Sequence, residues 1–270
     1  MGFSINTNVS ALKANLYMNN SSKNLERSLM ALASGSALAN AASNASGLAI
    51  ADSMSAQVGG LGQAMMNIND SIGMIQTADG GLAGYNENLL RMRELTLQAS
   101  NGVMGDSERQ AIQKEIDQLV ASSNDIANAT SFNDKKLLDG TGTFTFQTGA
   151  DQGNTQTVTI PDMSTASVLG SIDVTTDAGR ATALDSIDSA VTQVNDTRAT
   201  LGASQNRLSS TFNSVSLTQI NQAAAESQIR DIDFALESAN FSQQNLLTQT
   251  GAFAQAQSNA SAYNVMRLLQ

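Results

Sequence analysis

The amino-acid sequence predicts a mainly α protein: a long antiparallel helical bundle or coiled coil, with paired termini and a small β-hairpin region in mid-chain. Apolar residues recur every three or four positions over long stretches on both sides of the middle, the spacing of one face of an α-helix. Pro161 is the only proline, so almost nothing interrupts these helices. Residues 141–174 contain alternating apolar and polar side chains, which is typical of half-buried strands.

Composition narrows the possible functions. The chain has 270 residues, no cysteine, no histidine and a formal net charge of −10. Thiolate nucleophiles, imidazole bases and the usual zinc ligands are therefore missing, and nucleic-acid binding would need a basic face. Acidic pairs such as Asp231 with Asp233, or Glu115 with Asp117, are expected to be solvated helix charges. We expect no enzymatic activity, no cofactor and no metal site.

Targeting signals are equally sparse. No run of about 18 apolar residues occurs, so we expect no membrane insertion. The opening segment MGFSINTNVSALKANL has neither a basic n-region nor an apolar h-region, so we expect no cleaved secretory signal. These signals alone indicate a cytoplasmic protein, unless an export system recognises something other than a cleaved signal.

The first predicted helix spans about residues 8–33, and Thr7 or Asn8 can cap its start. Its apolar residues follow mostly helical spacing: Val9, Leu12, Leu16, Leu25, Leu29 and Leu32. Residues 34–47 read SGSALANAASNASG, which is small and polar with glycine at both ends. This composition predicts a connecting loop or a loosened helix.

The next helix is expected to begin near Leu48, and its stretch 61–99 organises the rest of the chain. At ~1.5 Å rise per residue this stretch would run roughly 58 Å, so it needs partner helices along its length. Its apolar stripe consists of Leu61, Met65, Ile68, Ile72, Ile75, Ala78, Leu82, Tyr85, Leu89, Met92 and Leu95.

Glycines mark the course and the end of this long helix. Gly80, Gly81 and Gly84 interrupt the stripe without changing its phase, so we expect a continuous helix. Asn101-Gly102 is expected to end it, with Gly102 in the left-handed conformation that a helix stop often requires.

Two further helices can partner the long one. Asp106 or Ser107 is expected to cap the first, which should lie antiparallel to the long helix after a short polar turn. Its stripe consists of Ile112, Ile116, Leu119 and Ile126. The second helix is expected to begin near Arg180, and Arg198 and Gln205 occupy two positions on its stripe. The apolar members are Leu184, Ile187, Val191, Val194, Leu201, Leu208, Phe212 and Val215.

The middle of the chain predicts strands. TFTFQT at 143–148 and TQTVTI at 155–160 alternate apolar and polar residues, and the intervening GADQGN is typical of a turn, so a β-hairpin is expected. Pro161 closes the second strand, and residues 171–175 are expected to add a third short strand.

The last arm, 238–270, contains a single charged residue, Arg267, and is apolar on more than one side. Both ends of the sequence are therefore helical and nearly uncharged. We expect them to pair and to bury their apolar faces against copies of the chain. The residues expected to carry this polymerisation are Leu12, Leu16, Leu29, Phe241, Leu247, Phe253 and Leu269.

Several motifs, in the right order, resemble bacterial flagellin. The N-terminal half contains SINTNVSALKAN, SGLAIADSM, NDSIGMIQTADGGL, LLRMRELTLQASNG and SFNDKKLLDG. The C-terminal half contains RATLGASQNRLSST, ESQIRDIDFALESANFSQQNLLTQTG and the closing NVMRLLQ. The resemblance covers nearly all of residues 1–140 and 180–270. It implies a structural subunit that self-assembles into the helical flagellar filament used for swimming.

The resemblance also implies an organisation and partners. Residues 1–45 with 236–270 would form an inner tube, 46–140 with 175–235 an outer tube, and 141–174 a short outer region in place of a large variable domain. The expected partners are other copies of the chain, an export chaperone on the C-terminal arm, the export apparatus, and cap and hook-junction proteins. The protein would be extracellular, in the flagellum, after export without a cleaved signal peptide.

In flagellins sensed by the vertebrate Toll-like receptor for flagellin, the receptor docks at an R-x-R-E-L motif and at a glutamate on the neighbouring helix. Those features fall here on Arg91, Leu95 and Glu115, a patch that can equally hold the bundle or neighbouring subunits together. Leu95 also fits the apolar stripe and so belongs partly to the core. Two departures from flagellins stand out: 34–47 has no charged residue, and Gln270 replaces a common terminal arginine.

Two alternatives to a filament subunit remain open at this stage. A hook–filament junction protein would share the same terminal architecture but be present in few copies. A monomeric helical binding module, such as an export chaperone, would stay monodisperse with ordered termini. The close match at both ends and the RMRELTLQASNG motif favour flagellin.

Overall fold

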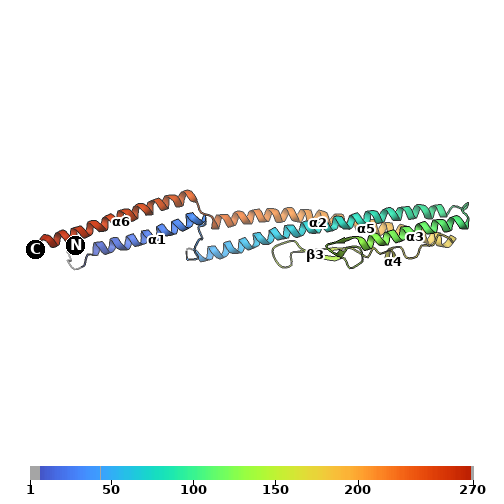
Figure 1. The fold of residues 1–270 in the computed structure, drawn as a ribbon, viewed down its shortest axis with the longest axis horizontal. Helices are drawn as coiled ribbons and strands as arrows, with labels where there is room; N and C mark the ends of the chain where they lie inside the picture. The colour runs from blue at the N-terminus through green and yellow to red at the C-terminus, as the bar shows by residue number, and fades with distance from the viewer. Residues whose placement is uncertain (1–6, 43, 269–270) are drawn as a thin grey trace. The chain divides into compact units, whose positions relative to one another are not determined.

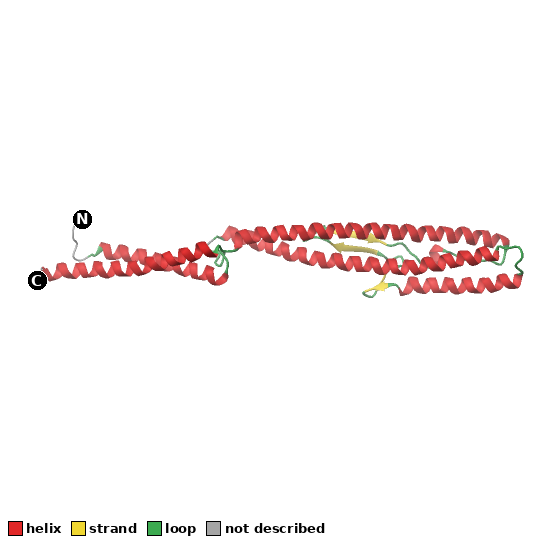
Figure 2. Ribbon diagram, turned by 90° about the horizontal axis from the view of Figure 1, so that it is seen from above, coloured by secondary structure: helices red, strands yellow, loops and turns green. Residues whose placement is uncertain are grey.

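The computed structural model describes residues 7–42 and 44–268, and this part of the chain is mainly helical (Figures 1 and 2). The elements are α1 Val9–Ser34, α2 Ala45–Ala99, α3 Asp106–Ala129, β1 Ser131–Phe132, β2 Lys135–Lys136, β3 Thr143–Gln147, β4 Thr155–Thr159, α4 Thr165–Val168, α5 Asp177–Arg230 and α6 Phe234–Leu268. The predicted fold class, a mainly α protein of long antiparallel helices with a small mid-chain β-hairpin and paired termini, is confirmed.

The chain packs into two units, each built from separate stretches of sequence. The first comprises Met1–Ala56 and Asn221–Gln270, and the second comprises Gln57–Ile220. Both boundaries fall within the continuous helices α2 and α5.

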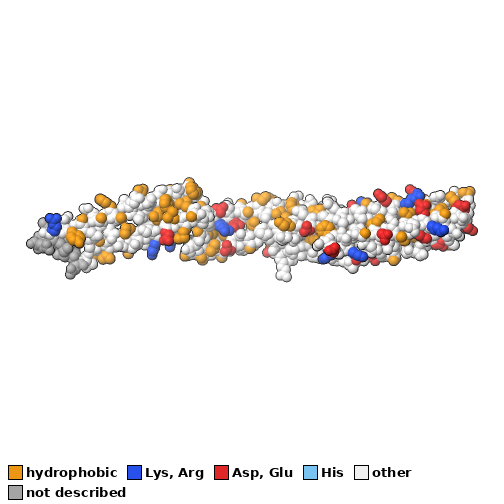
Figure 3. Space-filling model, in the orientation of Figure 1, with side chains coloured by type: hydrophobic (Ala, Val, Ile, Leu, Met, Phe, Trp, Pro, Cys, Tyr) orange, Lys and Arg blue, Asp and Glu red, His pale blue; other side chains and the backbone are white. Residues whose placement is uncertain are grey.

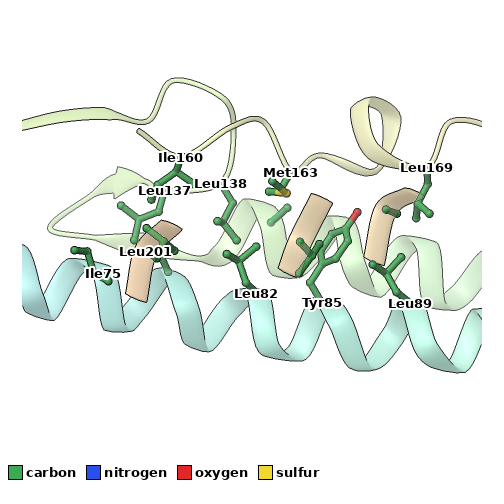
Figure 4. Close-up of a cluster of buried hydrophobic side chains, with 14 of the residues drawn as sticks. Ile75, Leu82, Tyr85, Leu89, Leu137, Leu138, Ile160, Met163, Leu169 and Leu201 are labelled. Carbon is green, nitrogen blue, oxygen red and sulfur yellow. The ribbon is translucent and has the colours of Figure 1, made fainter. Parts of the chain in front are cut away.

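The core of the second unit lies along α2, where the predicted stripe is buried apart from Met65 and Ile72, which pack against it partly buried. Helices α3 and α5 supply the facing side chains, among them Ile116, Ile187 and Leu201. The chain between α3 and α5 contributes as well. Figure 4 shows its buried residues directed toward the stripe of α2: Leu137, Leu138, Ile160, Met163 and Leu169.

Helix α2 continues through Gly80, Gly81 and Gly84, as predicted. A Cβ at Gly81 would lie 2.5 Å from Oγ1 of Thr130, at the end of α3, so only glycine permits this close approach. Gly81 therefore allows close packing against the end of α3, whereas a Cβ at Gly80 would meet no atom within 4 Å.

The end of α2 differs from the prediction, because Gly102 is not in the left-handed region. The amide of Ser100 donates to both the Thr96 and the Leu97 carbonyls, at 3.1 and 3.2 Å, and the amide of Asn101 donates to the Gln98 carbonyl at 3.1 Å. Hydrogen bonds from residue i to residue i−3, as in a 3₁₀-helix, thus tighten the last turn and satisfy its carbonyls without a left-handed residue.

The predicted cap of α3 was also wrong. Gly105 is the N-cap, in an extended conformation and without a side-chain hydrogen bond, whereas Asp106 and Glu108 lie within the first turn. Their carboxylates stabilise the helix start through the helix dipole rather than by capping it.

The predicted hairpin is confirmed: β3 and β4 pair antiparallel, with Thr143 opposite Thr159 and Gln147 opposite Thr155. The expected third strand at 171–175 is wrong. The backbone of this segment bonds to the side chain of Gln113 instead. Nε2 of Gln113 donates to the Ile172 carbonyl at 2.9 Å, and its Oε1 accepts from the Val174 amide at 2.8 Å. The two-residue strands β1 and β2 were not predicted, since such short pairs show no periodicity.

Candidate assembly surface and contact patch

Helices α1 and α6 of the first unit run antiparallel along each other, so the termini are paired as predicted (Figures 1 and 2). Asn8 secures one end. Its Oδ1 caps α1 by accepting from the Ala11 amide at 3.0 Å, and its Nδ2 donates to the Ser258 carbonyl at 3.2 Å. The Ser258 hydroxyl donates back to Asn8 Oδ1 at 3.2 Å, so one asparagine both starts α1 and holds it to α6.

The seam between α1 and α6 follows a repeat of three and four residues, the spacing of a coiled coil. Its partly or fully buried positions include Ala11, Ala14, Met18, Ser21, Leu25, Ser28 and Leu32 on α1, and Phe241, Gln244, Thr248, Gly251, Gln255 and Ser258 on α6. Most of these side chains are small or polar. The seam therefore buries little apolar surface for helices of this length.

Most of the larger apolar side chains of the pair face outward. Those predicted to carry polymerisation have these exposed fractions: Leu12 62%, Leu16 60%, Leu29 49%, Leu247 45% and Phe253 75%. Phe241 instead lies partly buried in the seam, and Leu269 lies outside the described residues. Figure 3 shows hydrophobic side chains spread over α1 and α6 with few charges among them. This distribution is the reverse of an ordinary soluble helix pair.

Backbone hydrogen bonds close the other end of the pair. The Ala37 amide donates to the Arg230 carbonyl at 2.8 Å, and the Ile232 amide donates to the Gly35 carbonyl at 3.2 Å. Gly35 ends α1 in the left-handed conformation, with φ of 68°. Main-chain bonds of this kind join the loop after α1 to the α5–α6 junction, although the loop carries no charged side chain.

In the second unit, the structure brings Arg91 and Glu115 together. The Arg91 Nη2 lies 2.7 Å from Glu115 Oε1 and its Nη1 lies 3.2 Å from Glu94 Oε2. The hydrogen bond to Glu115 is the main cause that raises the pKa of Arg91. Leu95 is not part of this exposed patch, because it is only 2% exposed and packs in the core.

Sequence reasoning missed two ion pairs that join α2 to α5. Arg93 Nε lies 2.6 Å from Asp188 Oδ1, and Arg198 Nε lies 2.7 Å from Asp79 Oδ1. The position of Arg198 on an apolar stripe was the available signal, since a charge there needs a partner on the facing helix. Its pKa is raised mainly by the hydrogen bond to Asp79.

Buried hydroxyls were also missed. Tyr85 is fully buried, and neither its hydroxyl nor that of Ser123 has a hydrogen-bond partner within the described residues. Burial, with a smaller effect from Asp162, raises the pKa of Tyr85 to about 12.

Among the described residues, no helix is both long and apolar enough to cross a membrane. The same part of the chain holds no cluster of three or more histidines, cysteines, aspartates or glutamates that could bind a metal ion. Long helices with a bonded terminal pair whose apolar faces point outward define a helical structural protein of the self-associating class.

Comparison with known proteins specifies the class. Residues 5–143 match the bacterial flagellin N-terminal helical region and residues 184–269 the C-terminal helical region. The chain belongs to the bacterial flagellin family, a family of structural proteins. It is 38% identical to a flagellin of Bacillus subtilis strain 168, over 98% of this chain and 99% of that one. It is 35% identical to the flagellar filament 31.3 kDa core protein of Treponema maltophilum, with the same coverage.

Solved structures agree with this assignment. The crystal structure of Bacillus cereus flagellin is 32% identical, with a TM-score of 0.51 over 60% of this chain and 94% of that one. A Vibrio parahaemolyticus protein described as hook-associated has a TM-score of 0.56 over 66% of this chain and 95% of that one. At 15% identity it shows the shared fold alone.

Proposed function

We propose that this filament subunit polymerises through the outward apolar faces of α1 and α6. The observation that carries the proposal is the composition of the seam: most side chains between the two helices are small or polar, whereas Leu12, Leu16 and Phe253 lie outside. Burial of apolar surface contributes about 25 cal/mol per Å², so covering these faces with copies of the chain supplies the driving force for assembly.

The two units have different roles in this proposal. The first unit, with α1 and α6, forms the inner tube of the filament. The α2–α3–α5 bundle forms the outer tube, and the hairpin of β3 and β4 lies outermost. The charged residues support this division, because most of them belong to the second unit, while α6 contains only Glu237 and Arg267.

Export and assembly partners follow from the same surface. The apolar faces of α6 need a cover before assembly, and an export chaperone that binds α6 would supply it. The subunit then leaves the cell through the flagellar export apparatus and meets the hook-junction and cap proteins at the growing filament. The family relationship supports these partners, and no observation favours a role as the hook junction itself.

The Arg91–Glu115 pair is proposed as a second contact surface. Both side chains are about half exposed and their charges are directed at each other across α2 and α3. A neighbouring subunit, or the vertebrate Toll-like receptor for flagellin, could contact this patch through its polar atoms. Leu95 would contribute by holding the α2 backbone in place from the core rather than by direct contact.

The test places a charge on the proposed assembly face of the full-length protein. Leu246 on α6 is 62% exposed, so Leu246→Lys should leave the monomer folded by circular dichroism but prevent seeded filament growth seen by electron microscopy. Thr157→Lys, on an exposed position of the β-hairpin, is the matched control and should assemble normally. Normal filaments from Leu246→Lys would contradict the proposed surface.

A further inference from the structure

The turn between α2 and α3 contains the only Asn-Gly pair in the chain, Asn101-Gly102. Both residues are exposed and follow the end of the helix. A side chain at Gly102 would meet no atom within 4 Å, so the space around its backbone is open. Within the described part of the chain, the Gly102 amide donates no hydrogen bond, which leaves its nitrogen unengaged.

Hydrogen bonds within the turn hold Asn101 next to this amide. The Asn101 amide donates to the Gln98 carbonyl at 3.1 Å, and the Asn101 carbonyl accepts from the Met104 amide at 3.1 Å. The side-chain Oδ1 of Asn101 accepts from the Val103 amide at 3.3 Å. This bond ties the Asn101 side chain to the backbone two residues ahead, and it also polarises the side-chain carbonyl, which makes its carbon a better target for a nucleophile.

We propose that Asn101 is a self-modification site, at which the folded chain converts asparagine to aspartate and isoaspartate without an enzyme. The Gly102 nitrogen gives its proton to hydroxide and bonds to Asn101 Cγ. The bond from Cγ to the side-chain nitrogen then breaks, and that nitrogen takes a proton from water and leaves as ammonia. Water then opens the five-membered succinimide at either carbonyl. No oxidant or reductant is needed, and the site is independent of filament assembly.

The chain also contains two Asp-Gly pairs, which could form the same succinimide, but their surroundings differ from those of Asn101-Gly102. Asp79-Gly80 lies inside α2, where the backbone is helical and Asp79 is paired with Arg198. Asp139-Gly140 lies in a loop, but the Asp139 carboxylate accepts from the Thr141 hydroxyl at 2.6 Å and from the Thr141 amide at 3.1 Å. Those bonds lower the pKa of Asp139, and a stable carboxylate anion is a poor target for a nucleophile.

The reaction changes the local charge as well as the backbone. A carboxylate at residue 101 adds a negative charge beside the C-terminal end of α2, which already carries partial negative charge. Arg109 is the nearby cation, since its Nε donates to the Ala99 carbonyl at 3.3 Å. Isoaspartate also inserts an extra carbon into the main chain of the turn. Modified and unmodified molecules therefore present different α2–α3 turns.

The experiment incubates the folded, full-length monomer at mildly alkaline pH and follows each asparagine by peptide mapping and mass spectrometry. The peptide that contains Asn101 should gain the deamidation mass before the others and should separate into aspartyl and isoaspartyl forms. Gly102→Ala fits the open space and should slow the conversion by roughly tenfold, which corresponds to about 1.4 kcal/mol of activation free energy.

Control variants make the test decisive. Asn44→Gln changes another exposed asparagine, whose Oδ1 accepts from the Gly47 amide at the start of α2, and it should leave the rate at Asn101 unchanged. Asn101→Gln should remove the signal. The proposal is overturned if Asn101 reacts no faster than the other asparagines, if Gly102→Ala reacts at the wild-type rate, or if only the unfolded protein is modified.

Discussion

Phe253→Ala is the sharpest perturbation of the proposed assembly surface. The side chain is 75% exposed in the described molecule, so its loss should change monomer stability by no more than ~0.5 kcal/mol. Alanine also has the higher helix propensity. A monomer that folds as well as the wild type would make any defect in assembly attributable to contacts between subunits.

The size of that defect follows from the exposed area. A phenylalanine side chain buries about 150–250 Å² when fully covered, and three quarters of that range is roughly 110–190 Å². At about 25 cal/mol per Å² this area corresponds to ~3–5 kcal/mol, of which the methyl group of alanine retains a part. A net loss of ~3 kcal/mol per subunit raises the critical concentration for polymerisation about 100-fold.

The assay is sedimentation of seeded filaments at a series of protein concentrations, together with thermal melting of the monomer. Phe253→Leu keeps most of the apolar area and should shift the critical concentration much less. A critical concentration equal to that of the wild type would refute the reasoning. A large drop in the monomer melting temperature would refute it too, because Phe253 would then belong to the monomer core.

Three further outcomes can be checked on the monomer. Tyr85 has a pKa of about 12 in the folded state and near 10 in the unfolded state, so its full contribution to the free energy of unfolding is present below pH ~10. About 2–3 kcal/mol of that free energy is lost as the pH rises to 12. Tyr85→Phe should remove this loss in urea titrations. Arg198→Ala should lower the free energy of unfolding by at most ~1 kcal/mol, since its ion pair with Asp79 is partly exposed; a loss above ~3 kcal/mol would show that the pair behaves as buried. Soluble monomer should activate receptor-reporter cells and intact filament should not, and Arg91→Ala should weaken the response without unfolding the protein, as a dose–response curve will show.

The long helices could be predicted because their evidence repeats many times. The stripe of α2 recurs at nearly every turn between residues 61 and 95, and a single misread position does not change its phase. The hairpin could be predicted from alternation on both sides of a turn sequence. The segment 171–175 could not, because its hydrogen-bond partner is the side chain of Gln113, almost sixty residues away, and no local pattern contains that information.

The assembly surface was only partly predictable. Sequence showed that the arms are apolar and nearly uncharged, but periodicity alone did not reveal which face lies between α1 and α6. The seam uses Ala14, Ser21 and Ser28, while Leu12, Leu16 and Leu29 lie outside, and both sets recur at helical spacing. Choosing between them requires the partner helix. For the same reason, sequence assigned Leu95 both to the R-x-R-E-L motif and to the apolar stripe, and only the packed helices show that it is buried.

The bond between Asn8 and Ser258 joins residues 250 positions apart in sequence. During synthesis, therefore, α1 emerges from the ribosome long before the helix that it pairs with, and the complete α1–α6 pair cannot form until translation has passed residue 258. Closing such a long loop is slow and entropically unfavourable. Only a chain that has received its last helix can therefore present both halves of the proposed assembly surface.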